Sequence, residues 1–162
     1  MAVSMERWYA VQKTLIEESR LLDEREWDVW LEMLLPEAEY WMPYAWGQES
    51  ALDHVSLFYE DVPLLRMRID RLKNDLSPLE WPPSRTNRHL SNIRIESDEG
   101  DRLTAKGYLM FVEYRRNEQR WFSGRVTWNL RETGQTFRIA AKRVDLLNCD
   151  QETGHLRIAA PI

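Results

Sequence analysis

The spacing of apolar residues predicts a helix at the start of the chain. Between residues 4 and 22, large apolar side chains recur at steps of three, four and seven, so they share one face of a helix. The residues on this predicted face are Trp8, Val11, Leu15 and Leu22, with Ile16 beside them.

Two further helices follow the same rule. Trp27, Trp30, Leu31 and Leu34 predict a shorter second helix that ends near Pro36, and Asp23 with Glu26 three places later has the pattern of a capping box. A third helix is expected to begin after Asp61, whose side chain can cap it, and to stop at Ser77 and Pro78. The residues on its apolar side are Val62, Leu65, Ile69, Leu72 and Leu76.

Two short segments between these helices favour strands. Residues 38–44 are rich in aromatic side chains, and Pro43 cannot donate to a ladder, which predicts a short strand at a sheet edge or a strand end. Residues 52–59 form a second, weaker candidate. Residues 77–87 contain three prolines and several turn formers, so we expect a connection on the surface.

After residue 88 the apolar residues alternate with polar ones, as strands with one buried face require. Four long strands are expected, at residues 88–96, 102–115, 119–131 and 135–146. The short turns between them predict an antiparallel meander. We therefore expect an α+β fold, in which a long, curved antiparallel sheet packs on the three helices of the N-terminal half. The expected single domain spans residues 1–162.

Composition narrows the classes of protein. The balance of 43% hydrophobic and 30% charged residues is typical of a globular domain, and a net charge of −5 argues against a nucleic-acid partner. The first residues lack the pattern of a signal peptide, and no apolar stretch approaches the roughly 18 residues of a membrane span. Together with the lone Cys149, this predicts a cytoplasmic protein without a membrane partner. Eight tryptophans indicate an aromatic core with a remainder available for oligomer contacts.

The chain lacks the residues for most metal and nucleotide chemistry. A Rieske 2Fe-2S centre needs two Cys and two His, and this chain has one Cys. The three histidines, His54, His89 and His155, lie far apart without paired spacing. Walker, dinucleotide-binding and nucleophile-elbow motifs are absent from the sequence. We therefore expect no cofactor and no metal ion in this chain.

One pair of residues could still be catalytic. Asp23, at the junction of the first two helices, and His89, on the first long strand, could act as general acid and base inside a cone-shaped fold. The structural alternative is that Asp23 caps the second helix and His89 bonds to the backbone of the sheet. Structural roles of this kind are the commoner ones for such residues.

The proline-rich connection carries the best candidates for contacts with another protein. Trp81 and Arg85 lie within it, and Arg88 follows it directly. Tryptophan and arginine are enriched in the energetically dominant parts of interfaces. We therefore expect Trp81, Arg85 and Arg88 to contact a partner. The basic residues of the third helix, such as Arg66 and Arg71, are more typical of a solvated helix face.

Several stretches, in order along most of the chain, resemble one family. They are residues 21–31 (LLDEREWDVWL), 37–43 (EAEYWMP), 59–61 (YED), 65–72 (LRMRIDRL), 83–93 (PSRTNRHLSNI), Gly124-Arg125 and 141–148 (AKRVDLLN). These stretches resemble the β (small) subunits of bacterial aromatic-ring-hydroxylating dioxygenases. The stretch Glu-Tyr-Trp-Met-Pro is most similar to the benzoate and anthranilate group.

The resemblance implies a cystatin-like cone of the nuclear-transport-factor type. It also implies assembly with a catalytic α subunit as an α3β3 hexamer with β–β contacts, with the Rieske 2Fe-2S cluster and the mononuclear Fe(II) in the α subunit. An electron-transfer reductase would act on that subunit. The family carries no catalytic motif in the β subunit, so no site residue is transferred. The alternative function is a free-standing isomerase or dehydratase of the same fold type, using Asp23 and His89.

Overall fold

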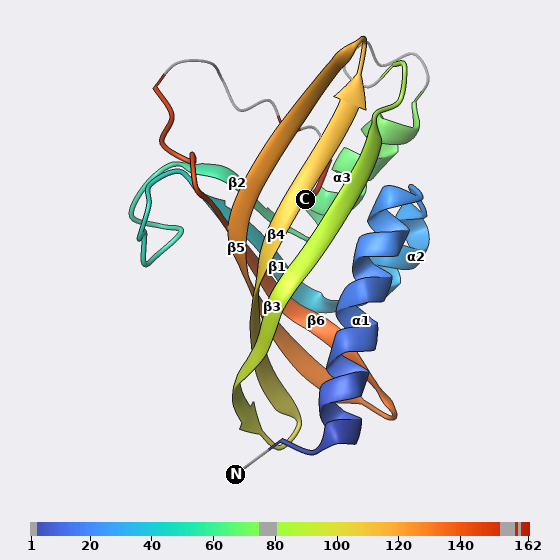
Figure 1. Ribbon diagram of the computed structural model, residues 1–162, viewed down its shortest axis with the longest axis vertical. Coiled ribbons are helices and arrows are strands. Elements are labelled where there is room, and N and C mark those ends of the chain that lie inside the picture. Colours follow the sequence, from blue (N-terminus) through green and yellow to red (C-terminus); the bar gives the residue numbers. More distant parts are fainter. Residues whose placement is uncertain (1–2, 75–80, 153–157, 159) are drawn as a thin grey trace.

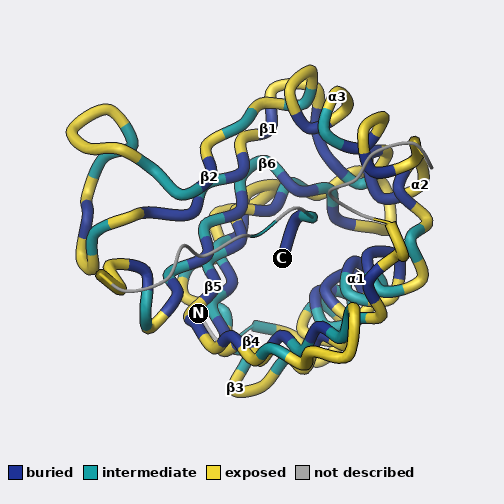
Figure 2. The backbone as a smooth tube through the Cα atoms, turned by 90° about the horizontal axis from the view of Figure 1, so that it is seen from above, coloured by how far each residue is buried: buried dark blue, intermediate teal, exposed yellow. Residues whose placement is uncertain are grey.

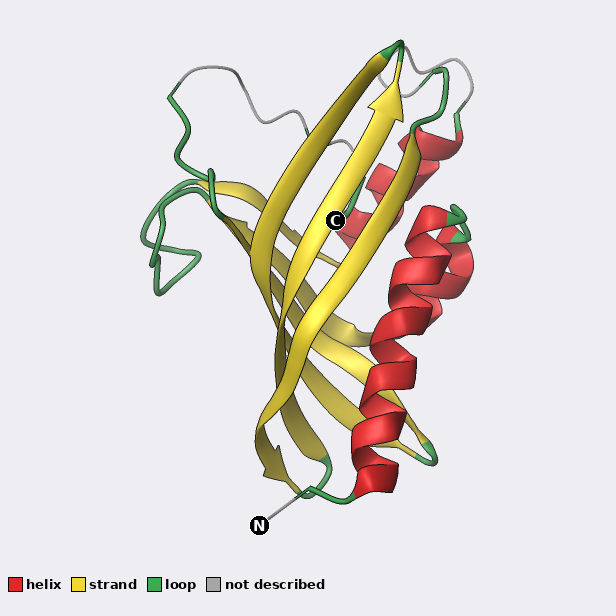
Figure 3. Ribbon diagram, in the orientation of Figure 1, coloured by secondary structure: helices red, strands yellow, loops and turns green. Residues whose placement is uncertain are grey.

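The computed structural model describes the whole chain except residues 1–2, 75–80, 153–157 and 159 (Figure 1). A long, strongly twisted sheet curves around one side of the molecule, and the helices pack along the other side (Figure 3). Viewed from above, the sheet and the helices surround a central region in which the last residues of the chain lie (Figure 2). Side chains of the hydrophobic core pack in this region, which we call the cone interior.

The predicted first helix is confirmed as α1 (Met5–Asp23). Ser4 caps it, because its side-chain oxygen accepts a hydrogen bond from the backbone N–H of Arg7 at 3.1 Å. Most of the predicted buried face is confirmed, because Val11, Leu15 and Leu22 are buried, whereas Trp8 and the adjacent Ile16 are exposed. Glu18 is buried on this face as well. A carboxylate therefore stands in the apolar stripe of this helix.

The second helix is shorter than predicted. α2 (Trp27–Glu32) ends well before Pro36, and strand β1 (Leu34–Pro43) already contains that proline. The ladder between β1 and its neighbour shifts register between Leu34 and Glu39, so Pro36 lies where no regular backbone donor is needed. The expectation that Asp23 caps α2 is wrong: Glu26 occupies the cap position, without a side-chain hydrogen bond.

The third helix, α3 (Val62–Lys73), begins as predicted, with the Asp61 side chain accepting from the N–H of Leu64 at 3.0 Å. It ends at Lys73, and the expected end near Ser77 lies outside the described residues. The weaker strand candidate is confirmed as β2 (Ser56–Asp61), although Leu52 belongs to the preceding loop and is exposed.

The four late strands form the predicted antiparallel meander. They are β3 (Arg85–Glu99), β4 (Arg102–Arg115), β5 (Glu118–Thr133) and β6 (Thr136–Leu146). The alternation predicted for β5 is also confirmed, because Phe122, Val126, Trp128 and Leu130 are buried. Gly124 lies on the same face, where a Cβ atom would come within 2.6 Å of the carbonyl oxygen of Asp145 on β6.

Of the two placements predicted for the strand with Pro43, the strand end is confirmed and the sheet edge is not. The strand order is β2-β1-β6-β5-β4-β3, so β1 lies inside the sheet, antiparallel to β2 and parallel to β6. The sheet is therefore mixed rather than wholly antiparallel. Pro43 is accommodated because it lies at the end of β1, where the ladder with β2 shifts register.

Candidate functional site

The first polar cluster of the cone interior forms around Glu18 of α1. This carboxylate is 1% exposed, and the Lys142 ammonium of β6 donates to it at 2.9 Å. The indole N–H of Trp128 donates to the other carboxylate oxygen at 2.8 Å. The indole N–H of Trp30 donates, at 3.4 Å, to the oxygen that Lys142 also contacts. Burial lowers the pKa of Lys142, and the charge of Glu18 opposes this shift. The cluster thus ties α1 and α2 to β5 and β6 through one fully partnered carboxylate.

The second cluster joins the end of α1 to β3. Asp23 accepts from the backbone N–H of Arg88 and from the hydroxyl of Thr86, each at 2.9 Å, and also from the Arg88 guanidinium. The side chain of Arg88 is 2% exposed. Burial lowers its pKa, and the attraction of Asp23 opposes the shift. Asp23 therefore anchors a helix end to the sheet.

Asp23 and His89 do not form the predicted acid–base arrangement. Successive side chains of a strand point to opposite faces. Since Arg88 points inward to Asp23, His89 points to the outer face, where it is exposed. His54 is exposed in the loop before β2, and His155 lies outside the described residues. The residue that actually meets Asp23 is a permanently charged arginine, which is unsuited to proton transfer near neutral pH.

The sequence reasoning missed Glu18 and Lys142, although a signal was present. Glu18 continues the helical stripe of Val11 and Leu15, and Lys142 has the parity of the buried Val144. Charged residues in such positions are rarely buried without a partner. The pattern therefore identifies both residues as candidates for a buried ion pair.

The described part of the chain offers little for metal binding or membrane insertion. Among the described residues, no group of three or more His, Cys, Asp or Glu side chains is placed to hold a metal ion. Cys149 is buried and free, and burial raises the pKa of its thiol. No helix among residues 3–74 or 81–152 is long and apolar enough to cross a membrane.

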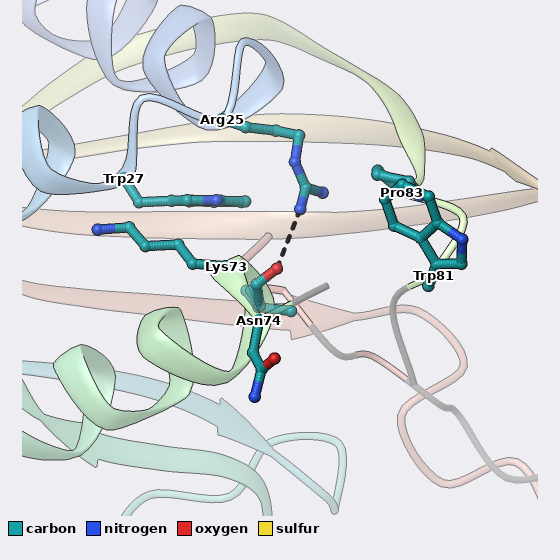
Figure 4. Close-up of a pocket in the computed structure, with 7 residues that line it drawn as sticks. Arg25, Trp27, Lys73, Asn74, Trp81 and Pro83 are labelled. Carbon is teal, nitrogen blue, oxygen red and sulfur yellow. Dashed lines mark hydrogen bonds between the residues drawn. The ribbon is translucent and has the colours of Figure 1, made fainter. Parts of the chain in front are cut away.

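A groove of about 280 Å³ lies beside the turn that leads into β3 (Figure 4). Arg25 crosses it, with its guanidinium 5.4 Å from the ring centroid of Trp27 and a hydrogen bond of 3.4 Å to the carbonyl of Leu72. Trp81 borders the groove and is 53% exposed, and its carbonyl accepts from Arg116 at 2.7 Å. The residues that line the groove are Arg25, Trp27, Leu72, Lys73, Asn74, Trp81 and Pro83.

Two of the three predicted contact residues are available on the surface. Trp81 is exposed at the groove, and Arg85 is exposed at the start of β3, where its guanidinium lies 4.7 Å from the ring centroid of Tyr114. Arg88 differs from the prediction: its side chain is buried in the cone interior, where it pairs with Asp23, so it is not accessible to a partner chain. The strand alternation that turns His89 outward turns Arg88 inward.

The fold and the family match together define the class of protein. The fold is the cystatin-like α+β cone, also found in a solved NTF2-like protein from Novosphingobium aromaticivorans (TM-score 0.61, 16% identity, covering 89% of this chain and 84% of that one). Residues 17–151 match the ring hydroxylating beta subunit family. The chain belongs to this family, the small subunits of aromatic-ring-hydroxylating dioxygenases.

Two relatives illustrate the similarity. The toluate 1,2-dioxygenase subunit beta of Pseudomonas putida is 33% identical over 156 residues, covering 91% of this chain and 93% of the relative. The crystal structure of the benzoate 1,2-dioxygenase beta subunit from Burkholderia mallei superimposes with a TM-score of 0.77 at 28% identity, covering 99% of both chains. The similarity therefore spans nearly the full length of these subunits.

Proposed function

We propose that this chain is the non-catalytic, structural β subunit of a Rieske non-haem iron dioxygenase that dihydroxylates an aromatic acid. The proposed type is benzoate- or anthranilate 1,2-dioxygenase, acting in the cytoplasm in aromatic catabolism. Membership of the small-subunit family carries the proposal. The substrate class is supported by relatives named for benzoate and toluate, both of which are aromatic acids. In this proposal residues 1–162 act as one domain.

The polar groups of the cone interior support a structural role. Glu18 is bonded to Lys142 and two indoles, and Asp23 to Arg88 and Thr86, so both carboxylates are engaged in holding elements together. A general base needs a free lone pair directed at a substrate proton. Asp23 and His89, the pair of the alternative isomerase or dehydratase, face different sides of the sheet. The geometry therefore favours the subunit over the free-standing enzyme.

The iron groups are assigned to the partner in this proposal. A Rieske cluster takes two Cys and two His ligands, and the lone Cys149 of this chain is buried. The residues present thus do not fit the cluster. A catalytic α subunit would hold the cluster and the mononuclear Fe(II), would accept electrons from a reductase, and would assemble with this chain as an α3β3 hexamer with β–β contacts.

Co-expression with the catalytic α subunit tests the proposal. We expect a complex of hexamer mass by light scattering that oxidises benzoate or anthranilate when reductase and NADH are supplied, whereas this chain alone has no turnover. An α chain that assembles and works equally well without this subunit would contradict the structural role. Turnover of a cyclic ketone or alcohol by the isolated chain, lost on His89→Ala, would support the isomerase instead.

We further propose that Trp81 and Arg85 contact a neighbouring subunit. Both are exposed, Trp81 at the groove and Arg85 at the start of β3, and the backbone of Trp81 accepts a hydrogen bond from Arg116. Trp81→Ala or Arg85→Glu should each weaken assembly by about 2 kcal/mol, the scale of an interface hot spot. Arg102→Glu, an exposed change at the opposite end of the β3–β4 ladder, is the matched control. Equally strong assembly in all three variants would show that this surface is not part of the interface.

A further inference from the structure

The last described residues of the chain enter the cone interior. Ile162 is 0% exposed and belongs to the main hydrophobic core. Its backbone N–H donates to the hydroxyl of Tyr40 at 2.9 Å, and the same hydroxyl donates to the carbonyl oxygen of Ile162. Arg88 donates to the carbonyl oxygen of Pro161. Figure 2 shows this end of the chain surrounded by sheet and helices.

The side chains that bond to this segment form a site of buried polar groups. Tyr40 is 1% exposed on β1, and the Arg88 side chain is 2% exposed on β3, so the two donors come from strands far apart in the sheet. The carbonyl oxygen of Pro161 accepts from the Nη2 of Arg88, and the carbonyl oxygen of Ile162 accepts from the Tyr40 hydroxyl. Buried donors are costly unless an acceptor is supplied, and residues 161–162 supply one to each of these two donors. The Nε of Arg88 stays without a hydrogen-bond partner within the described part of the chain.

The charges around the site determine which ligand it takes. The Arg88 guanidinium is paired with Asp23, and the Lys142 ammonium, 5.4 Å from the ring centroid of Tyr40, is paired with Glu18. Both buried cations are thus matched by carboxylates. The site therefore offers a ligand hydrogen-bond donors without an unbalanced charge, beside an apolar core. A peptide segment with free backbone carbonyls and an aliphatic side chain fits these donors and this core.

From this geometry we infer that the cone interior contains a peptide-binding site, which residues 161–162 occupy in cis. The site recognises two successive backbone carbonyls through Arg88 and Tyr40, and buries the side chain of Ile162 in the core. The segment closes the space in which a cone-shaped enzyme of the alternative kind would need to hold a substrate. The inference does not depend on the partner subunit.

A truncated chain tests the site directly. Deleting residues 161–162 should lower the melting temperature, and the peptide Ile-Ala-Ala-Pro-Ile, the sequence of residues 158–162, should restore it in a saturable manner, because a ligand that binds only the folded state stabilises it. The full chain, whose site is filled, should bind this peptide at least about tenfold more weakly. A peptide ending in Lys in place of Ile is the control and should have no effect.

Two outcomes of this titration would overturn the inference. One is equal peptide binding by the full and truncated chains, since the added peptide would then bind elsewhere. The other is stabilisation of the truncated chain by benzoate but not by the peptide, which would indicate a site for a small carboxylate.

A variant of the full chain keeps the inference testable if the truncated chain does not fold. Tyr40→Phe removes both hydrogen bonds to Ile162 and keeps the aromatic ring. Carboxypeptidase should then remove the last residues at least about tenfold faster than in the unchanged chain, because digestion follows the population of the released segment. Tyr59→Phe, at a tyrosine that bonds to Glu39 on the surface, is the matched control. Equal digestion rates in Tyr40→Phe and Tyr59→Phe would refute the site.

Discussion

The buried pair of Glu18 and Lys142 allows a quantitative prediction. Glu18→Gln keeps the size of the side chain but removes the charge that balances the Lys142 ammonium, which is 4% exposed. The amide also replaces one acceptor oxygen by a donor, which must face either Lys142 or the indole N–H of Trp128. One substitution therefore leaves a buried cation without its partner and places two hydrogen-bond donors against each other.

The expected cost is large for a single substitution. Removing one partner of a buried ion pair costs roughly 3–5 kcal/mol, because the remaining charge stays desolvated. For a domain of this size 1 kcal/mol corresponds to a shift of about 2–4 °C, so the melting temperature should fall by about 6–20 °C. Lys142→Met should also destabilise, since Glu18 would then be a buried anion held by indoles alone.

Urea unfolding at pH 7, followed by circular dichroism, measures both variants and their combination. The double variant Glu18→Gln/Lys142→Met removes both charges of this pair. Its loss in the free energy of unfolding should therefore be smaller than the sum of the losses in the single variants, by about 0.5–3 kcal/mol. Glu17→Gln is the matched control, because Glu17 neighbours Glu18 but forms an exposed ion pair with Arg20. A loss of at most about 1 kcal/mol is expected there. Equal losses in Glu17→Gln and Glu18→Gln would refute the reasoning.

Two further predictions concern Tyr40 and Gly124. Burial raises the pKa of Tyr40 above its ordinary value of 10.0, so the unfolded chain releases this proton at a lower pH than the folded chain. The free energy of unfolding should therefore be unaffected below pH 10 and fall above it, by about 1.4 kcal/mol per pH unit more than in Tyr40→Phe. Urea titrations between pH 9 and 11 will measure this difference. Equal alkaline slopes in the two chains would exclude Tyr40 as the cause. Gly124→Ala places a methyl group 2.6 Å from the carbonyl oxygen of Asp145 and should cost about 1–3 kcal/mol by thermal unfolding. Ser123→Ala, on the outer face, should stay within about 0.5 kcal/mol, and a neutral Gly124→Ala would show that β5 and β6 can move apart.

The late strands and the helices could be predicted from the sequence because their signals are local. The alternation along β5 decides which side chains face the core, and the short turns leave only antiparallel pairing to β3, β4, β5 and β6. The cap at Asp61 is equally local, since it needs only one side chain and the backbone three residues later. The count of cysteine ligands is a property of composition alone. These features need no knowledge of distant contacts.

Only the tertiary structure decided how distant segments meet. β1 lies inside the sheet because it pairs with β6, about a hundred residues away, and no local pattern specifies that partner. Glu18 and Lys142 are separated by 124 residues, and Asp23 finds Arg88 rather than the expected His89 because strand geometry turns one inward and its neighbour outward. The entry of Ile162 into the cone depends on Tyr40, 122 residues away. Local periodicity thus determined most of the elements and the buried face of β5, whereas side-chain pairing between distant elements determined the buried polar clusters.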